Sequence, residues 1–283
     1  LLQASRFEFV FVHREAMPIG PPIIEWCIAK VHKKRIIYDF DDAIWLTDKT
    51  DETALARGVK WRSKVRSICK WSYRISCGNE YLARYARQFN PAVTINPTTV
   101  NHQAIPIASF DDAKKNITIG WTGSRSTLKY LDSIVPVLQS LERKHAVIRF
   151  LVIADRDPKL PLNNFYFRLW SKETEIVDLQ QIDIGIMPLP DDAWTRGKCG
   201  FKALQYMSLS IPAVVSPVGV NQEIISHGLE GYLSTTSNEW FSCLEHLVLN
   251  PAKRIEMGKR GRQKVIRDYS VSANSANFLS LFQ

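Results

Sequence analysis

The stretch GFKALQYMSLSIPAVVSPVGVNQEII, residues 200–225, decides the fold. Apolar side chains recur at helical spacing in residues 201–209, and the β-branched run 211–215 suits a strand that is buried on both faces. Gly219 then permits a tight turn, and Asn221 is a good N-cap for a second helix. The stretch therefore predicts two helices that begin at the carboxyl ends of neighbouring strands. Their free N–H groups make a natural site for an anion.

Strands and helices alternate on both sides of this stretch, which indicates an α/β fold with parallel, doubly wound sheets. The first half has strand candidates at residues 7–12, 35–38, 73–77 and 92–95, and helix candidates at 23–31 and 80–88. The second half has strand candidates at 117–121, 147–154, 182–187 and 231–233, and helix candidates at 126–143, 174–181, 238–249, 251–268 and 271–282.

Residues 97–116 contain two prolines and no sustained period, so we interpret them as the connection between two lobes. The boundary is expected near residue 108, which gives lobes at 1–108 and 109–265. Because the chain begins with Leu1 and almost directly enters an apolar run, we expect an N-terminal piece of a longer protein to be missing.

The composition is that of a soluble globular protein, with 45% apolar and 23% charged residues among 283. The five cysteines are scattered without a C-x-x-C pair, which favours a reducing compartment over a disulfide framework. No apolar run approaches the ~20 residues that a membrane-spanning helix needs. We therefore expect a cytoplasmic protein, with peripheral contact to the inner membrane face as an option.

The net charge of +9 is unevenly distributed. The segment 53–79 has seven basic residues and no acid, namely Arg57, Lys60, Arg62, Lys64, Arg66, Lys70 and Arg74. One interpretation is the solvated face of a helix. The other is attraction to an anionic membrane surface, because Trp61 and Trp71 are interleaved with the charges. No nucleic-acid-binding module accompanies the patch, so nucleic acid is not an expected partner.

A second glycine turn follows the strand candidate 117–121. Gly123 lets the backbone approach a ligand, and Ser124 or Ser126 can cap the next helix. Arg125 and Lys129 lie on or near its first turn, where a cation is unfavourable unless an anion is also present. The turn therefore suggests a diphosphate site. A tight turn with two solvated cations is the alternative.

Residues 200–225 resemble the donor-binding segment of the retaining GT-B glycosyltransferases of family 4, written E-x7-E…G-x-P-V-V…G-G-x-x-E. The two Glu positions fall on Gly197 and Gln205. The resemblance implies two Rossmann-like lobes that face each other across a cleft, the first of them incomplete here. It also implies a C-terminal helix, 266–283, that packs back on the first lobe. The second lobe would bind a nucleotide-diphosphate sugar and the first an acceptor, with retention and without cofactor or required metal.

By the same resemblance, Arg125 and Lys129 look like diphosphate ligands, and Gln205 takes the place of the Glu that holds the ribose hydroxyls. The sugar would be held by Lys198 or by a backbone group, since Gly197 has no side chain. The expected donor-binding residues are Gly123, Ser124, Arg125, Lys129, Lys198, Gly200, Phe201, Gln205, Gly219, Val220, Asn221 and Glu223. Glu223 is also explained as an ordinary partner of a helix dipole.

An acidic cluster, Asp39-Phe40-Asp41-Asp42, follows the strand candidate 35–38. It resembles a metal-binding D-x-D motif. It also resembles the first motif of haloacid-dehalogenase-type phosphohydrolases, with Asp191-Asp192 as the later acidic pair. In a two-lobed transferase it would instead contact acceptor hydroxyls or act as a base. The predicted catalytic residues are Asp41, Asp42 and Lys202, and the predicted acceptor-side residues are His13, Arg14 and Asp39.

The histidines show no spacing typical of a zinc site. The sequence therefore predicts a glycosyltransferase of glycan or glycolipid biosynthesis. Its acceptor would be a glycan, a lipid-linked intermediate or a small molecule. A phosphohydrolase that uses Asp39 and Asp41, and a non-catalytic relative that lacks turnover, are the two alternatives.

Overall fold

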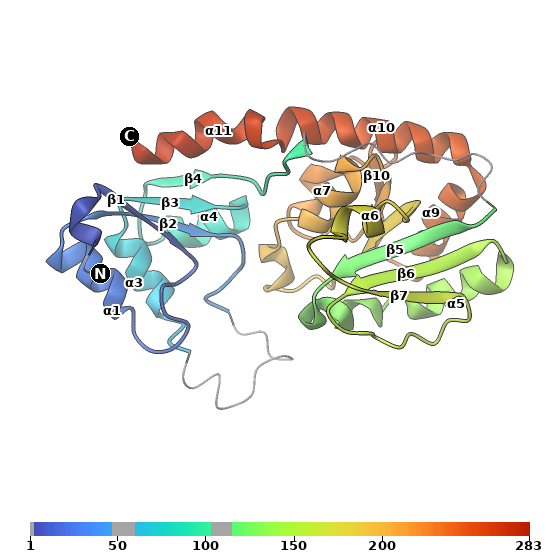
Figure 1. Cartoon of the computed structure of the whole chain (residues 1–283), viewed down its shortest axis with the longest axis horizontal. Coiled ribbons are helices and arrows are strands. Elements are labelled where there is room, and N and C mark those ends of the chain that lie inside the picture. The colour runs from blue at the N-terminus through green and yellow to red at the C-terminus, as the bar shows by residue number, and fades with distance from the viewer. Residues whose placement is uncertain (1–2, 47–59, 103–114) are drawn as a thin grey trace. The chain divides into compact units, whose positions relative to one another are not determined.

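The computed structural model describes residues 3–46, 60–102 and 115–283. These residues form two compact units (Figure 1). The first unit combines Leu1–Thr98, Asp191–Cys199 and Asn274–Gln283, and the second combines Thr99–Pro190 and Gly200–Ala273. The boundary predicted near residue 108 lies outside the described residues, as does Arg57.

The first unit is built on a parallel four-stranded sheet in the order β1-β2-β3-β4. Its strands are β1 (Phe9–His13), β2 (Arg35–Phe40), β3 (Arg74–Cys77) and β4 (Val93–Ile95). Its helices are α1 (Ile23–Trp26), which continues as a wider turn over Cys27–Val31, α3 (Lys64–Trp71) and α4 (Glu80–Arg87). All four strands end at one edge, so the side chains after them converge there.

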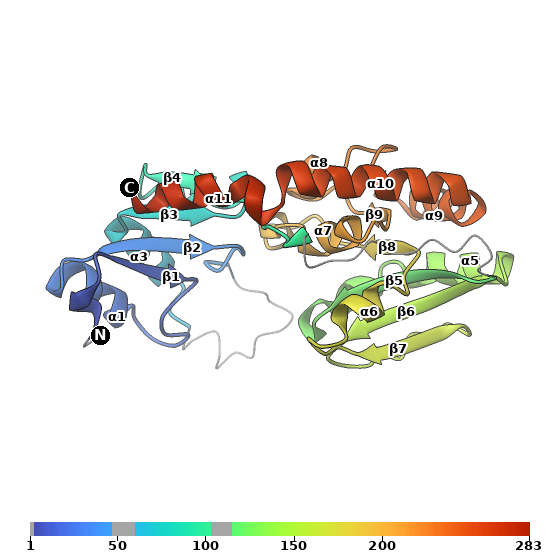
Figure 2. The ribbon, with the colours of Figure 1, turned by 45° about the horizontal axis from the view of Figure 1, so that its top comes forward.

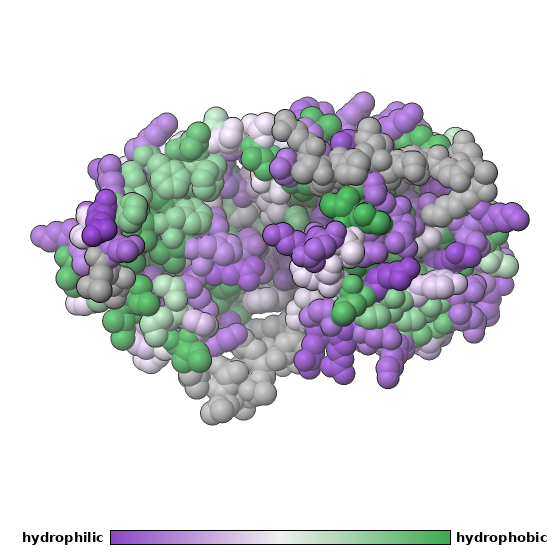
Figure 3. Space-filling view, in the orientation of Figure 1, coloured by the Kyte–Doolittle hydropathy of each residue, from purple (hydrophilic) through white to green (hydrophobic). Residues whose placement is uncertain are grey.

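The C-terminal helix α11 (Val271–Leu279) and the residues after it pack on one face of this sheet (Figures 1 and 2). The Asn277 amide donates to the carbonyl oxygen of Ile95 at 2.8 Å. The Tyr73 hydroxyl donates to the carbonyl oxygen of Gln283 at 2.7 Å. The rings of Phe11 and Phe278 lie 5.9 Å apart, and hydrophobic side chains gather over this part of the unit in Figure 3.

The second unit contains a parallel six-stranded sheet in the order β10-β9-β8-β5-β6-β7. Its strands are β5 (Ile117–Gly123), β6 (Ile148–Ala154), β7 (Phe165–Leu169), β8 (Ile184–Met187), β9 (Ala213–Val215) and β10 (Gly231–Leu233). Its helices are α5 (Val135–Lys144), α6 (Glu175–Leu179), α7 (Phe201–Ser208), α8 (Asn221–Ile224), α9 (Ser237–Leu249) and α10 (Pro251–Asp268).

The core of the second unit lies on both faces of its sheet. Leu151 and Ile153 of β6 pack with α7 and α10, whereas Phe150 and Val152 pack with α5 and α9. Successive strand residues point to opposite faces, so a strand covered on both faces must be apolar throughout. This arrangement explains the apolar run of residues 150–154 in β6.

The prediction of an α/β fold with parallel sheets is confirmed. The single helix predicted over residues 126–143 is wrong. Arg125–Leu131 forms tight 3-10 turns, and α5 begins only at Val135. The reason is Pro136, which has no N–H group to donate inside a longer helix but fits the first turn of α5. Strand β7 was not predicted.

The basic stretch is not one solvated helix. Helix α3 begins at Lys64, whose side chain is 3% exposed and lies 2.7 Å from the Glu15 carboxylate. Arg74 belongs to β3 and donates to the carbonyl oxygen of Ser280 at 2.9 Å. Lys60, Trp61, Arg66 and Lys70 are exposed. In the part of the chain that the structure describes, no helix is long and apolar enough to span a membrane.

Tyr206 joins α7 to two strands of the second sheet. Its buried hydroxyl accepts the Thr122 N–H at 3.0 Å and donates to the Ile186 carbonyl oxygen at 3.4 Å. Its ring occupies the space beside Gly185, where an added Cβ would lie 2.3 Å from a ring carbon. Burial raises the pKa of the Tyr206 phenol well above its ordinary value, so the hydroxyl stays protonated and can serve both bonds.

We predict that Tyr206→Phe destabilises the protein by about 1–3 kcal/mol, because the buried Thr122 N–H loses its acceptor. Urea unfolding followed by fluorescence measures this difference. Tyr166→Phe is the matched control, since the Tyr166 side chain is half exposed, and it should change stability by less than about 0.5 kcal/mol. Equal losses in the two variants would contradict the role of the Tyr206 hydroxyl.

Candidate functional site

A cavity of ≈ 350 Å³ lies at the carboxyl edge of the second sheet, beyond the ends of β5, β6 and β7. Ligands of open parallel α/β sheets bind at this edge. The lining residues are Thr122, Gly123, Ser124, Asp155, Trp170, Glu175, Phe201, Lys202 and Gln205. The cavity thus brings together Gly123, Ser124, Phe201, Lys202 and Gln205 from the residues that the sequence predicts for donor binding and catalysis.

Lys202 lines the cavity, and its side chain lies beside the Trp121 ring. Its Nζ lies 5.4 Å from the ring centroid of Trp121, within the range of a cation–π interaction. Gly123 leaves room for both side chains, because an added Cβ there would be 2.4 Å from Trp121 and 2.8 Å from the Cε of Lys202. The glycine at the end of β5 therefore leaves space for a lysine from the first turn of α7.

The turn after β5 already has an anion at its N-terminus. The N–H of Arg125 donates to Oδ1 of Asp155 at 2.5 Å. The Ser124 and Ser126 hydroxyls contact each other at 3.0 Å, and the expected cap by either side chain is wrong. The carboxylate of Asp155 thus lies at the start of this turn, where the sequence pattern suggests a bound diphosphate. The Nζ of Lys129 lies 5.4 Å from the Tyr130 ring centroid.

A carboxylate and an amide face each other in the same cavity. Oε1 of Glu175 accepts hydrogen bonds from Nε2 of Gln205 at 3.1 Å and from the Trp170 indole N–H at 3.0 Å. Gln205 is 8% exposed. The position where the resemblance expects a carboxylate therefore carries an amide that is hydrogen-bonded to a carboxylate from α6.

The turn after β9 contains four more residues of the predicted donor set, Gly219, Val220, Asn221 and Glu223. Gly219 has a φ of 54°, in the left-handed region, as expected for a glycine turn. Asn221 is buried and donates to the carbonyl oxygen of Ser216 at 3.0 Å, so its prediction as an N-cap is wrong. Helix α8 begins at Asn221 with Val220 before it, and Glu223 is exposed on this single turn.

Gly200 precedes α7 with a φ of 69°. An added Cβ would lie 2.2 Å from Cδ1 of Ile224. A side chain at this position would therefore be strained and would also push α8 away from α7. The glycine that opens the fold-deciding stretch is required both by its backbone conformation and by the close packing of these two helices.

In the first unit, His13 and Asp39 end neighbouring strands and lie opposite each other in the register of β1 and β2. Nδ1 of His13 is 2.7 Å from Oδ2 of Asp39. The histidine side chain is 52% exposed and the carboxylate 23%, so this pair can be reached by a ligand. The structure brings these two predicted acceptor-side residues into direct contact.

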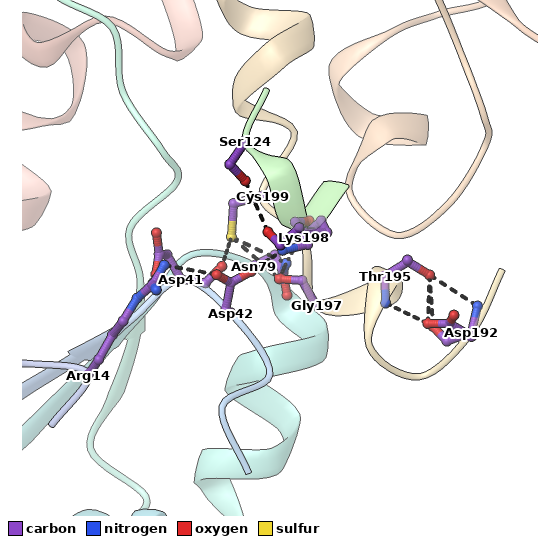
Figure 4. Close-up of polar contacts among 11 residues, drawn as sticks. Arg14, Asp41, Asp42, Asn79, Ser124, Asp192, Thr195, Gly197, Lys198 and Cys199 are labelled. Carbon is purple, nitrogen blue, oxygen red and sulfur yellow. Dashed lines mark hydrogen bonds and ion pairs between the residues drawn. The ribbon is translucent and has the colours of Figure 1, made fainter. Parts of the chain in front are cut away.

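Arg14 joins the acidic cluster after β2 (Figure 4). Its Nε donates to Asp41 at 2.9 Å, and its Nη2 donates to Asp42 at 2.8 Å. Lys198 donates to the other oxygen of Asp42 at 2.9 Å. Burial alone would lower the pKa of Arg14, but the two carboxylates raise it above its ordinary value. The predicted metal or nucleophile carboxylates thus form ion pairs. Among the described residues, no group of three or more His, Cys, Asp or Glu is arranged to hold a metal.

The segment Asp191–Cys199 belongs to the first unit, so Lys198 lies there and not with the rest of the predicted donor set. Asn79 holds the segment, because its amide donates to the carbonyl oxygens of Gly197 and Lys198, both at 3.2 Å. Gly197 packs against Ala43, and an added Cβ would lie 2.8 Å from the Ala43 Cβ. This contact explains the glycine at the position where the resembling family has a Glu.

Cys199 ends this segment. Its thiol lies 3.1 Å from the carbonyl oxygen of Asp41, and an added Cβ at Gly78 would meet its sulfur at 2.3 Å. Burial raises the pKa of the Cys199 thiol to about 12. The thiol is therefore protonated and protected while the segment stays in place, and its reactivity reports on that contact.

Sequence reasoning missed several of these residues. Trp170 follows β7, the strand that was not predicted, and Glu175 begins the helix predicted over 174–181, where no motif marked it as a site residue. Asp155 directly follows the strongly apolar strand β6, and its position at a strand end was a usable signal. Asn79 similarly follows β3 and begins α4 as its N-cap, accepting the Leu82 N–H at 3.0 Å.

Residues 116–250 match the family model described as Glycosyl transferases group 1. This segment is a glycosyltransferase domain. It contains every lining residue of the cavity, and the prediction of a glycosyltransferase is confirmed in this form. A comparison of the sequence with curated proteins gave no match.

Solved structures of glycosyltransferases share the fold of the whole chain. Sucrose-phosphate synthase from Thermosynechococcus elongatus matches with a TM-score of 0.72 at 12% identity, over 98% of this chain and 73% of that one. HepE from Anabaena, in complex with UDP and glucose, matches with a TM-score of 0.73 at 11% identity, over 99% and 79%. TarM matches with a TM-score of 0.72 at 15% identity, over 97% and 54%. The fold is that of the GT-B glycosyltransferases.

We predict that Asn79→Asp exposes Cys199 while it preserves helix α4. Aspartate keeps the N-cap acceptor but replaces the two donors to residues 197 and 198 with a carboxylate that repels those carbonyl groups. Iodoacetamide should label Cys199 at least about tenfold faster than in the wild type, since each lost hydrogen bond costs about 1 kcal/mol.

Peptide mass spectrometry gives the labelling rate of each cysteine, and Cys243 serves as the internal reference. Asn79→Ala, which also removes the N-cap, should increase the rate further and lower the stability by about 1 kcal/mol. An unchanged Cys199 rate in Asn79→Asp would show that the amide does not hold the segment.

Proposed function

We propose that the chain transfers a glycosyl group from a nucleoside diphosphate sugar to an acceptor hydroxyl, with retention of configuration, in glycan or glycolipid biosynthesis. The observation that carries this proposal is the cavity at the carboxyl edge of the second sheet, inside the glycosyltransferase domain, with Lys202 on its wall. Nucleotides bind at this edge of parallel α/β sheets. Retention follows from the resemblance of residues 200–225 to family 4.

The leaving diphosphate gathers negative charge as the glycosidic bond breaks. Lys202 and the backbone N–H groups of Gly200 and Phe201 at the start of α7 stabilise that charge. Arg125 and Lys129 supply further positive charge at the turn after β5. Gly219–Glu223 after β9 are the remaining proposed donor contacts of the second unit. Lys198, predicted as a donor contact, belongs to the first unit and pairs there with Asp42.

The acceptor binds the carboxyl edge of the first sheet. Asp39 and Asp41 are 23% and 42% exposed and accept hydrogen bonds from acceptor hydroxyls. His13 holds Asp39, and Arg14 holds Asp41 and Asp42. Asp42 lies between two cations, so its role is to position Arg14 and Lys198. A glycan, a lipid-linked intermediate and a small molecule are all acceptors that such a set accommodates.

The phosphohydrolase alternative is not favoured, because Asp39 and Asp41 are engaged by His13 and Arg14. A non-catalytic relative is the second candidate, and one observation favours it: Gly197 packs too closely against Ala43 for a side chain that could contact the sugar. Binding of a nucleoside diphosphate sugar without turnover would identify that case. Turnover of any such donor would exclude it.

Contact with an anionic membrane surface is a further proposal for the first unit. Lys60, Trp61, Arg66 and Lys70 are exposed, and Trp61 exposes 54% of its surface. Basic residues beside an exposed tryptophan suit the interface of an anionic bilayer. Sedimentation with vesicles of anionic and neutral lipids tests this contact.

We predict that Lys202→Ala weakens the binding of nucleoside diphosphates at least tenfold, because a charge-assisted contact to phosphate is worth about 1.5–3 kcal/mol. Isothermal titration calorimetry with UDP, GDP and ADP, without added metal, measures the affinity. Lys259→Ala on the exposed face of α10 is the matched control. Equal affinities for the two variants would show that Lys202 does not contact the diphosphate.

We predict the opposite effect for Asp155→Asn. The carboxylate lies in the same cavity as Lys202 and opposes a second anion, whereas an asparagine oxygen can still accept the Arg125 N–H. The affinity for nucleoside diphosphates should rise about threefold to tenfold, in line with a charge interaction near a protein surface. Asp157→Asn, two residues further along, should leave it unchanged. Weaker binding in Asp155→Asn would mean that Asp155 contacts the ligand favourably.

A further inference from the structure

Glu175 is the acidic side chain that α6 contributes to the cavity of the second unit. Both of its hydrogen bonds, from Gln205 and from the Trp170 indole, go to the same oxygen, Oε1. Two donors on one oxygen fix the orientation of the carboxylate. These two contacts therefore also set the position of the second oxygen, Oε2, although neither Gln205 nor Trp170 donates to it.

The chemistry of this group restricts what it can bind. An ionised carboxylate only accepts hydrogen bonds, so its ligand must present O–H or N–H groups. It also repels a phosphate group. A pair of neighbouring hydroxyls is a suitable ligand, because one carboxylate can accept from both.

Gln205 cannot take this role in the same way. Its side chain is 8% exposed, and its amide N–H donates to Glu175. The amide is neutral, so a hydrogen bond from a ligand hydroxyl to it is weaker than one to a carboxylate. Gln205 and Trp170 instead position the carboxylate of Glu175.

We propose that Glu175 accepts hydrogen bonds from the ribose 2′- and 3′-hydroxyls of the donor nucleotide and thereby selects ribonucleotides over deoxyribonucleotides. The proposal rests on the proposed function, since it assigns the nucleoside end of the ligand in the same cavity. Lys202 at the start of α7 then serves the diphosphate end, and Glu175 the ribose end. The site rejects nucleotides that carry a phosphate on the ribose hydroxyls, because that phosphate would meet the carboxylate.

The test compares UDP with 2′-deoxy-UDP, and GDP with 2′-deoxy-GDP, by isothermal titration calorimetry of the full chain. The wild type should bind the ribonucleotide at least tenfold more tightly than its deoxy counterpart. Glu175→Gln should lose about tenfold for the ribonucleotide, and the preference should fall to about twofold or less. Its affinity for the deoxynucleotide should stay within about twofold, which shows that the cavity is intact. These values follow from a charge-assisted hydrogen bond of about 1.5–3 kcal/mol.

Glu173→Gln is the matched control, because Glu173 is exposed two residues before Glu175, and it should retain the full preference. If Glu175→Gln lost the same factor for both sugars, or kept the wild-type preference, Glu175 would not contact the ribose, and the proposed function would be unaffected. If the wild type bound none of the four nucleotides, the donor assignment itself would fail, and this inference with it.

Discussion

The buried hydroxyl of Tyr206 is the contact on which the second unit depends. It accepts the Thr122 N–H at the end of β5 and donates to the Ile186 carbonyl oxygen in β8. It therefore fixes α7 against the two central strands, and residues of α7 and of the end of β5 line the cavity. The Tyr206 ring fits only because residue 185 is a glycine, which has no Cβ. Lys202 and Gln205 precede Tyr206 on the same helix, so this contact also positions them.

The first unit is held together at its functional edge by polar contacts instead. Asn79 follows β3, caps α4, and donates to the carbonyl oxygens of Gly197 and Lys198. One amide thus joins the sheet to a segment more than a hundred residues away in sequence. Lys198 then reaches Asp42, which also accepts from Arg14. Because Arg14 pairs with Asp41 and Asp42, and Lys198 also pairs with Asp42, these two carboxylates are suited to orienting hydroxyl groups.

The sequence predicted the elements whose signal is local. Apolar runs and glycine turns located the strands on both sides of α7, and the parallel fold followed from their alternation. It failed where the decisive contact is distant or the signal is short. Pro136 interrupts a helix that apolar spacing alone extends, and the edge strand β7 was not recognised. Trp170 and Glu175 lie beyond that missed strand. Asparagine is a residue type that often forms an N-cap, yet in the folded chain the Asn221 amide donates to the carbonyl oxygen of Ser216. No local pattern carries that information.

The two positions at which the chain departs from the resembling family have different physical explanations. At Gly197 a side chain would clash with Ala43, so an acidic residue there would require the loop after β2 to move. Gln205 keeps the shape of a glutamate but gives its hydrogen bond to Glu175, and the negative charge is found on the partner. Near position 205 the carboxylate therefore belongs to Glu175, which is hydrogen-bonded to Gln205 in the same cavity. At position 197 no side chain supplies a carboxylate. If the cavity binds a nucleoside diphosphate sugar as proposed, the contacts to the sugar come from backbone groups or from side chains other than that of residue 197.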